Sequence, residues 1–286
     1  MSSKQKGILY TICSAFCFSW MNIFIRLTGD IPTMEKAFFR NLIAFFFALA
    51  VLKRSNIPLK IEKNHLPGLL LRSGLGTIGI ICNFYAVDHL LVADANILNK
   101  LSPFFVIIFS IFILKEKISL PQVSFIALAF IGALFIIKPG VVGMDLVPAL
   151  IGTCGGIAAG GAYTFVRYLG NKGVAGAIIV LFFSGFSCIA MVPGLILNFK
   201  IPTILQLICL IMTGVSAAGG QFSITAAYKN APAREISIYN YTEIMFTALF
   251  AWLLFTQIPD GYSFIGYIII CLTSFGMFLY NNRKSN

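Results

Sequence analysis

Charged residues are scarce in this sequence, at 11% of the 286 residues, whereas hydrophobic residues make up 58% and the mean hydropathy is +0.90. A soluble domain of this length usually has about a quarter charged residues. The hydrophobic residues form blocks of about 20, the length of helix that crosses about 30 Å of hydrocarbon. This composition excludes an ordinary soluble domain and predicts an all-α integral membrane protein.

Histidine is nearly absent, and cysteine lacks the spacing that metal sites require. The chain has only His65 and His89, and its seven cysteines fall inside hydrophobic blocks without a C-x-x-C pair. Zinc sites need several His or Cys ligands, and a buried free Cys packs as a small hydrophobe. We therefore expect packing cysteines and no metal or other cofactor.

Acidic residues are also few, and 10 Asp and Glu against 21 Lys and Arg give a net charge of +11. A nucleic-acid-binding protein carries such an excess on a water-exposed face with little apolar bulk. Here the basic residues lie mostly in short loops between hydrophobic blocks, where they orient membrane helices. The pattern therefore indicates membrane lipid, and no nucleic acid, as a partner.

Ten hydrophobic blocks are long enough to span a membrane, and no connection has room for a soluble domain. The predicted spans are 7–28, 33–52, 67–87, 92–114, 118–137, 147–167, 174–197, 203–226, 232–255 and 260–281. If the N-terminus is cytoplasmic, nearly all loop Lys and Arg residues lie inside, and the outer loops hold only Lys138 and Lys200. This bias predicts a plasma or inner membrane protein with both termini in the cytoplasm.

The two halves of the chain resemble each other. "FSWMNIFIR", ending at Arg26, is similar to "AGGAYTFVR", ending at Arg167, and Ala86, Ala93 and Leu114 match residues 140 positions later. The similarity predicts two five-helix repeats, residues 1–138 and 139–286. Because five is an odd number, the second repeat must be inverted in the membrane, as in many transporters whose site lies between repeats.

Several segments in combination resemble the EamA family of the drug/metabolite transporter superfamily. They are "SAFCFSWMNIFIR", "EKAFFRNLIAF", "FYAVDHLLVADANILNKLSPFFVIIFSIFILKEKISL", "FIGALFIIKPG", "AYTFVRYL", "AAYKNAPAREISIYNYTEIMFTALFAWLLF" and "SFIGYIIICLTSFGMFLY". Together they cover nearly the whole chain. The resemblance implies two EamA repeats around a central cavity, a peripheral fifth helix in each repeat, and transport of small metabolites, commonly efflux.

The fourth span carries a polar stripe. Asn96, Asn99, Lys100 and Pro103 follow the i, i+3, i+4, i+7 spacing of one helix face. That face should point into the bundle, because a polar stripe facing lipid is unfavourable. Pro103 removes a backbone hydrogen bond and so favours a kink, which serves either packing or a hinge.

The second span carries Lys36 and Arg40 four residues apart, with Asn41 beside them. A guanidinium group binds a carboxylate or phosphate through two parallel hydrogen bonds. Arg40 is therefore a candidate for binding an acidic group of a substrate. The alternative is an ion pair between two helices.

The ninth span contains the most unusual residue, Glu243, which lies near the middle of the membrane with Tyr239 and Asn240 on the same helix face. An ionised acid there is unfavourable by about 2.5–3.5 kcal/mol. Three arrangements offset this: a pair with Lys100 or Arg40, protonation in a dry site, or contact with substrate in a wet cavity. We favour a cavity-lining Glu243 with one basic partner.

Weaker candidates complete the predicted substrate-binding site. They are Trp20, Asn22, Asn83, Tyr163, Gln221 and Tyr241, which join Arg40, Asn99, Lys100, Tyr239 and Glu243. Trp20 could instead simply pack. "GTCGGIAAGG", residues 152–161, has small residues at 152, 156 and 160, the spacing of close helix packing. Four arginines near span ends are expected to reach lipid headgroups: Arg26, Arg72, Arg167 and Arg234.

The sequence therefore predicts a transporter of small polar metabolites, with amino acids or related solutes as the substrate class. It would work by alternating access, with protons as a candidate coupling ion, as a monomer or a homodimer. One alternative is an exporter of organic cations or drugs in which Glu243 binds the cation. An integral-membrane enzyme is another class, but no H-x-x-x-H, G-x-S-x-G or paired-acid motif supports it. The last alternative is a passive scaffold or a channel subunit.

Overall fold

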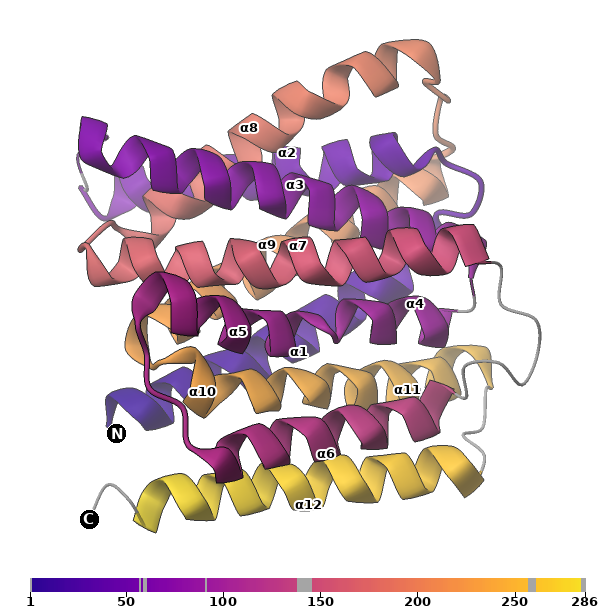
Figure 1. Cartoon of the computed structure of the whole chain (residues 1–286). Helices are drawn as coiled ribbons and strands as arrows, with labels where there is room; N and C mark the ends of the chain where they lie inside the picture. Colours follow the sequence, from indigo (N-terminus) through magenta and orange to yellow (C-terminus); the bar gives the residue numbers. More distant parts are fainter. Residues whose placement is uncertain are drawn as a thin grey trace.

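The protein is a bundle of helices (Figure 1). The computed structural model describes residues 2–56, 58, 61–90, 92–137, 146–256 and 261–283. Within them the helices are α1 (Ser3–Leu27), α2 (Thr33–Arg54), η1 (Lys63–His65), α3 (Leu66–His89), α4 (Val92–Asn99), α5 (Ser102–Leu114), α6 (Leu120–Ile137), α7 (Leu146–Asn171), α8 (Gly176–Leu197), α9 (Ile204–Asn230), α10 (Ala233–Ile236), η2 (Ser237–Tyr241), α11 (Thr242–Phe255) and α12 (Gly261–Arg283).

In the described part of the chain these helices form ten passes, as the sequence predicts. Eight passes are single α-helices, whereas α4 and α5 share one pass, and α10, η2 and α11 share another. Five helices are by themselves long and apolar enough to cross a membrane: α1, α3 with its preceding turn, α7, α8 and α9. Both chain ends lie at the same end of the bundle, here named the terminal end, on the left of Figure 1.

Capping residues define where two of the long helices begin. Ser2 accepts a hydrogen bond from the Gln5 backbone N–H at the start of α1, and Thr203 does the same for Gln206 at the start of α9. In both cases the Gln side chain accepts from the capping residue's backbone N–H. Each capping box therefore satisfies two amides that would otherwise lack partners.

The broken passes show the repeat in atomic detail. α5 begins at Ser102 and α11 at Thr242, a shift of 140 residues, as the sequence repeat predicts. The two helices also end alike, because Lys115 and Thr256 both adopt the left-handed conformation with φ of 54°. The five-helix pattern therefore extends from the sequence to the start and end of corresponding helices.

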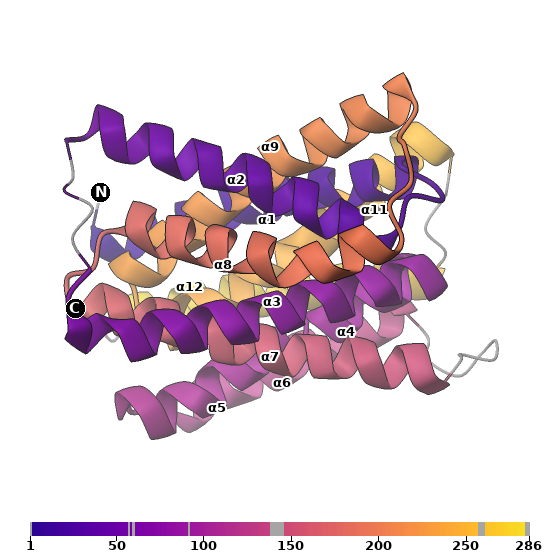
Figure 2. The same ribbon diagram turned by 90° about the horizontal axis from the view of Figure 1, so that it is seen from above.

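The packing of the helices is symmetric between the two repeats. α1 packs on α9, and the equivalent α7 packs on α3; α2 packs on its equivalent α8, and α6 on its equivalent α12. Figure 1 shows α6 and α12 side by side at one edge of the bundle. In Figure 2, which is seen from above, α2, α3 and α8 lie in front of them. The fifth helix of each repeat is therefore peripheral, as the family resemblance implies.

Small residues on α7 allow close packing against the broken pass of the first repeat. A Cβ atom added to Gly156 would lie 2.3 Å from the carbonyl oxygen of Leu98, and one added to Gly160 would lie 2.5 Å from Cβ of Phe105. Gly152 similarly meets Leu98 and Ala86 at 2.8 and 3.1 Å. The structure thus agrees with the packing role predicted for this spacing.

Arg167 connects three segments at the terminal end. Its Nη1 donates to the carbonyl oxygens of Tyr228 and Lys229, at 2.9 and 3.2 Å, in the last turn of α9. Its Nε lies 3.5 Å from Oε1 of Glu116, between α5 and α6. The expectation that Arg167 reaches lipid headgroups is wrong, because the partial negative charge at a helix C-terminus binds the guanidinium group instead. Arg26 is exposed, and the side chain of Arg234 lies outside the described residues.

Polar contacts also join the loops at the opposite end of the bundle. Lys36 Nζ lies 2.7 Å from Oδ1 of Asp88 and donates to the carbonyl oxygen of Gly29 at 2.9 Å. Lys200, between α8 and α9, pairs with Asp30, between α1 and α2. Each end of the bundle is therefore tied by side chains from separate helices.

The Asp30–Lys200 contact yields a prediction about pH. The hydrogen bond from Lys200 holds the pKa of Asp30 below its ordinary value. A carboxyl of lowered pKa stabilises the fold above its unfolded pKa and loses that effect as the pH falls through its folded pKa. Asp30→Asn should therefore lower Tm in detergent slightly and equally from about pH 8 to about pH 5, and the difference from wild type should shrink below about pH 4. A difference that stays constant down to about pH 3 would contradict this contact.

Candidate functional site

The pass formed by α4 and α5 is interrupted in the middle. α4 ends at Asn99, Lys100 and Leu101 form a turn, and Pro103 occupies the second position of α5. A proline is accommodated in the first turn of a helix because the backbone N–H that it lacks has no intrahelical acceptor there. The sequence predicts a kink at Pro103, and the structure shows a complete break just before it.

The equivalent pass of the second repeat is interrupted at the same register. The 3₁₀ turn η2 separates the short α10 from α11, and Glu243 lies in the first turn of α11. The Tyr241 hydroxyl donates to the carbonyl oxygen of Lys100 at 3.0 Å, so the two interruptions are in direct contact. The two breaks expose backbone and polar side chains in the interior of the bundle, as at the binding sites of many transporters.

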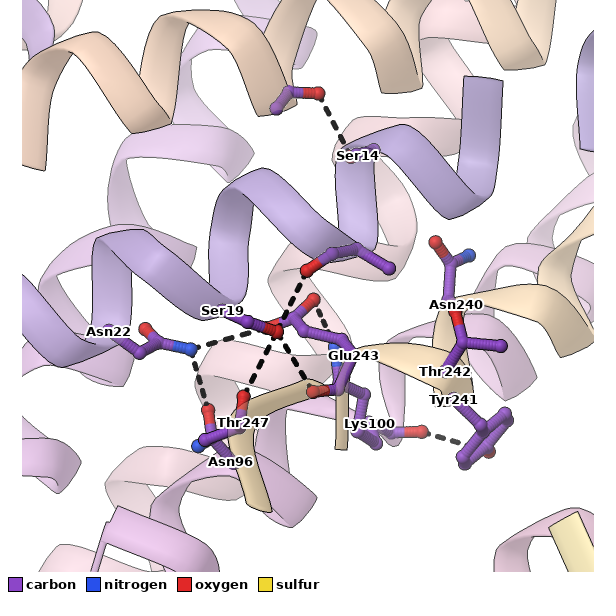
Figure 3. Close-up of polar contacts among 12 residues, drawn as sticks. Ser14, Ser19, Asn22, Asn96, Lys100, Asn240, Tyr241, Thr242, Glu243 and Thr247 are labelled. Atoms are coloured by element: carbon purple, nitrogen blue, oxygen red, sulfur yellow. Dashed lines mark hydrogen bonds and ion pairs between the residues drawn. The ribbon is translucent and has the colours of Figure 1, made fainter. Parts of the chain in front are cut away.

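Glu243 and Lys100 form an ion pair between the two interruptions. Lys100 Nζ lies 2.6 Å from Oε2 of Glu243, and both side chains are buried. Asn22 of α1 donates to Oε1 of Glu243 at 3.2 Å and to Oδ1 of Asn96 at 2.9 Å (Figure 3). The N-terminus of α11 adds a favourable dipole for the carboxylate. This arrangement explains how an acid is held inside the membrane.

The backbone at Glu243 is also tied to α1. The Ser19 hydroxyl donates to the carbonyl oxygen of Glu243 at 2.9 Å, and Thr247 donates to Ser19 at 3.1 Å (Figure 3). α1 therefore contacts both the carboxylate and the helix that carries it. A movement of α1 relative to α11 would have to break these bonds.

A cavity of about 70 Å³ adjoins the ion pair. It is lined by Phe18, Met21, Asn22, Arg40, Arg72, Gly76, Gly79, Ile80, Asn83, Phe84, Asn99, Lys100, Ser102, Ala159, Ala162, Tyr163, Phe183, Gln221, Asn240 and Glu243. All passes contribute except α6 and α12, which are peripheral. A second hollow, of about 260 Å³, lies between α3, α5 and α7, but its lining is almost entirely apolar. Only the first of these two cavities is lined by several charged and polar side chains, so it is the candidate site.

Eight of the eleven predicted site residues line this cavity. They are Asn22, Arg40, Asn83, Asn99, Lys100, Tyr163, Gln221 and Glu243. Arg40, Lys100 and Glu243 share one hollow even though they come from α2, from the turn after α4 and from α11. The arrangement of Glu243 combines two of the predicted alternatives, since it has a basic partner and also borders the cavity.

Three predicted residues do not line the cavity. Trp20 packs against Phe250, with ring centroids 4.5 Å apart and the rings tilted by 32°, because it lies on the opposite face of α1 from Phe18 and Asn22. Tyr239 packs in a hydrophobic cluster with residues of α5, α6 and α12. The Tyr241 hydroxyl donates to the carbonyl oxygen of Lys100, but Tyr241 is not among the residues that line the cavity. The prediction that Tyr239 shares a face with Glu243 assumes an α-helix, and the 3₁₀ turn rotates Tyr239 away.

Three charged, aromatic or polar residues line the cavity but are not part of the site predicted from the sequence: Arg72, Phe183 and Asn240. Arg72 is only 2% exposed, so the expectation that it reaches headgroups is wrong. A signal was present, because Arg72, Gly76, Gly79 and Asn83 follow i, i+4, i+7, i+11 spacing and share one face of α3. A helix position near the membrane surface gives the depth of a side chain but not its direction.

The charge of the lining is strongly positive. Arg40 and Arg72 are both buried, and no ion pair of the described residues includes either of them. Arg40 donates from Nη1 to Oδ1 of Asn41 at 2.8 Å, while its Nε and the Nε and Nη1 of Arg72 lack partners within the described chain. A cation inside a membrane is unfavourable by about 2.5–3.5 kcal/mol. The site is therefore suited to a small solute that brings negative charge.

Comparison with known proteins places this geometry in a family. The model of the EamA-like transporter family matches residues 5–138 and 147–279. The chain is 30% identical over 268 residues to the pseudopaline exporter CntI of Pseudomonas aeruginosa, covering 93% of each protein. It is 25% identical to a riboflavin transporter of Rhizobium johnstonii, covering 97% of this chain and 91% of that protein.

More distant similarity reaches animals and solved structures. The chain is 24% identical to human solute carrier family 35 member G1, covering 94% of this chain and 78% of that protein. A crystal structure with 15% identity superposes with a TM-score of 0.85 over 99% of both chains, which supports the fold alone. The chain belongs to the EamA-like transporter family of the drug/metabolite transporter superfamily.

Proposed function

We propose that this transporter exports small polar metabolites that carry a carboxylate, with amino acids and related solutes as the substrate class. The observation that carries the proposal is the cavity between the repeats, where Arg40, Arg72 and Lys100 face a single acid, Glu243. Guanidinium groups bind carboxylates strongly and with defined geometry. Asn22, Asn83 and Gln221 supply further polar contacts around the same hollow.

Alternating access is the mechanism that this architecture supports. The inverted repeats meet at two broken passes, and the helices at each end of the bundle are tied by separate contacts, Arg167 at the terminal end and Lys36 with Asp88 at the opposite end. Opening one end breaks one set of contacts and leaves the other closed. The positive loops favour a terminal end in the cytoplasm of a plasma or inner membrane.

Proton exchange through Glu243 is the simplest coupling scheme. Ionised Glu243 would turn from Lys100, now at 2.6 Å, to an amino group of the substrate, while Lys100 binds the substrate carboxylate. Protonation of Glu243 would remove its attraction for the amino group, so an incoming proton would displace the solute. The protein would act as a monomer or a homodimer, since each chain contains a complete cavity.

The names of the relatives agree with transport of small metabolites, because they include a pseudopaline exporter and a riboflavin transporter. The rival proposal, an exporter of organic cations, has less support. Glu243 already has a cationic partner in Lys100, and two further buried cations would repel a positive substrate. Export of a carboxylate-bearing solute accounts for all of these charges.

A ligand screen followed by exchange tests the proposal. Purified protein would be heated with single amino acids and organic acids, and compounds that raise Tm would be assayed for counterflow in proteoliposomes. We expect carboxylate-bearing compounds to raise Tm and to exchange across the membrane. Stabilisation by organic cations alone would favour the rival.

Arg40→Ala gives a first prediction for transport. The variant removes a lining cation whose only hydrogen-bond partner among the described residues is its neighbour Asn41, so we expect counterflow of a carboxylate substrate to fall about tenfold or more while Tm changes little. Lys100→Ala should also reduce counterflow, with a larger loss of Tm because Glu243 is left unpaired. Arg26→Ala, at an exposed position of α1, is the control. Unchanged counterflow in both variants would remove these residues from the site.

A further inference from the structure

Arg40 and Arg72 approach the same aromatic ring from different helices. The guanidinium carbon of Arg40 lies 5.9 Å from the centroid of Phe183, and that of Arg72 lies 4.0 Å from it. The two carbons are therefore no farther apart than the sum of these distances. A pair of cations is held together inside the bundle on one aromatic support.

This arginine pair has no counter-charge in the described chain. Glu243 is the one acid among the residues that line the cavity, and Lys100 neutralises it at 2.6 Å. Two positive charges therefore remain after the ion pair is counted. Three guanidinium nitrogens, Nε of Arg40 and Nε and Nη1 of Arg72, are buried without hydrogen-bond partners.

Packing fixes the Arg72 side chain in this place. A Cβ atom added to Gly76 would lie 2.1 Å from Nη1 of Arg72 and 2.8 Å from Cε2 of Phe183. The absence of a side chain at Gly76 therefore leaves the space that the guanidinium group and the ring share. Gly74 lies about half a turn earlier on the same helix. A Cβ atom added to Gly74 would have no atom within 4 Å.

We propose that Arg40 and Arg72 form a subsite for two negative charges, so that the substrate carries two acidic groups. The inference rests on the proposed function and narrows its substrate class. A single carboxylate would neutralise only one arginine and leave the other buried with an unbalanced charge. Two carboxylates, or one doubly charged phosphate, neutralise the pair and satisfy its unpartnered nitrogens.

Matched amino acids test this charge requirement on the wild-type protein. Glutamate and glutamine have nearly the same shape and differ by one carboxylate, and phosphoserine and serine differ by one phosphate. We expect glutamate or phosphoserine to bind at least about tenfold more tightly than its counterpart with a neutral side chain in thermal-shift titrations, and to exchange faster in counterflow. Preference within the first pair indicates two carboxylates, and preference within the second indicates phosphate.

A matched pair of glycine variants tests the position of the subsite. Gly76→Ala displaces the Arg72 guanidinium group without removing its charge, so the preference for the doubly acidic ligand should fall to about threefold or less. Gly74→Ala should keep the wild-type preference. Arg72→Gln should abolish the preference, and the glycine pair remains informative if that variant does not fold.

The outcomes separate this inference from the proposed function. If glutamine exchanges as well as glutamate, and serine as well as phosphoserine, the two-charge subsite is wrong while transport of carboxylate solutes stands. If none of the four compounds and no other organic acid binds or exchanges, both proposals fail. An undiminished preference in Gly76→Ala and Arg72→Gln would also overturn the assignment to this arginine pair.

Discussion

Replacing Glu243 with Gln should abolish transport driven by a pH gradient while leaving measurable binding of a carboxylate substrate. The variant keeps the shape of the side chain and an acceptor for Asn22, but it cannot bind or release a proton. It also leaves Lys100 buried without its partner at 2.6 Å. Breaking a buried pair in this way destabilises proteins by about 3–5 kcal/mol, and we expect the lower end because the pair borders a cavity.

Three measurements on Glu243→Gln separate transport from stability. Uptake into proteoliposomes should be followed with and without a pH gradient, and Tm should be recorded in the same detergent. The double variant Lys100→Gln with Glu243→Gln should regain much of the lost Tm but no gradient-driven transport. Glu62→Gln, on the exposed loop before α3, is the matched control. Gradient-driven uptake at the wild-type rate would rule out Glu243 as the proton site, and loss of organic-cation binding would favour the cation exporter.

Among Gly→Ala variants at the described glycines, Gly156→Ala should be the most damaging. Its Cβ would lie 2.3 Å from the carbonyl oxygen of Leu98, which is a backbone atom and cannot rotate away. Overpacking of this kind destabilises by about 1–3 kcal/mol. Because Leu98 lies in the last turn of α4, two residues before the break at Lys100, we also expect counterflow to fall by more than about tenfold.

A graded control accompanies Gly156→Ala. Gly161→Ala, on the same helix, would bring its Cβ to 2.9 Å from Cδ1 of Leu75, the flexible end of a side chain that can move. We expect a smaller fall in Tm for Gly161→Ala and little change in counterflow. Equal Tm values for the two variants, measured side by side in detergent, would show that α7 moves away from α4 at low energy.

Ten passes and an inverted repeat can be predicted from this sequence because hydrophobic length and repeat spacing report the membrane environment directly. The peripheral fifth helices are implied by the resemblance to the EamA family. Helix breaks are harder to predict. Residues 92–114 are predicted as one span with a proline, and nothing in their hydropathy distinguishes a kinked helix from two helices. The backbone interruption at Lys100 depends on contacts such as the Tyr241 hydroxyl, which comes from the other repeat.

The candidate site, too, can be predicted from the sequence only in part. The helical spacing of Asn96, Asn99 and Lys100 predicts a face that points into the bundle, and Asn99 and Lys100 both line the cavity. The sequence gives the wrong positions for Trp20, Tyr239 and Arg72 because their direction depends on rotation and local helix type. Hydrophobicity gives no information about direction for a large aromatic side chain, which packs equally well against lipid-facing neighbours or in a polar cavity.

The small volume of the cavity has a consequence for the proposed transport cycle. A volume of about 70 Å³ admits only on the order of a few water molecules, well below the roughly 300 Å³ of a usual ligand pocket. Under the proposed alternating access, the repeats would therefore have to separate to admit a solute. Because Lys100 and Glu243 neutralise each other at 2.6 Å, the carrier would be able to return without cargo, with this internal ion pair in the place of the solute.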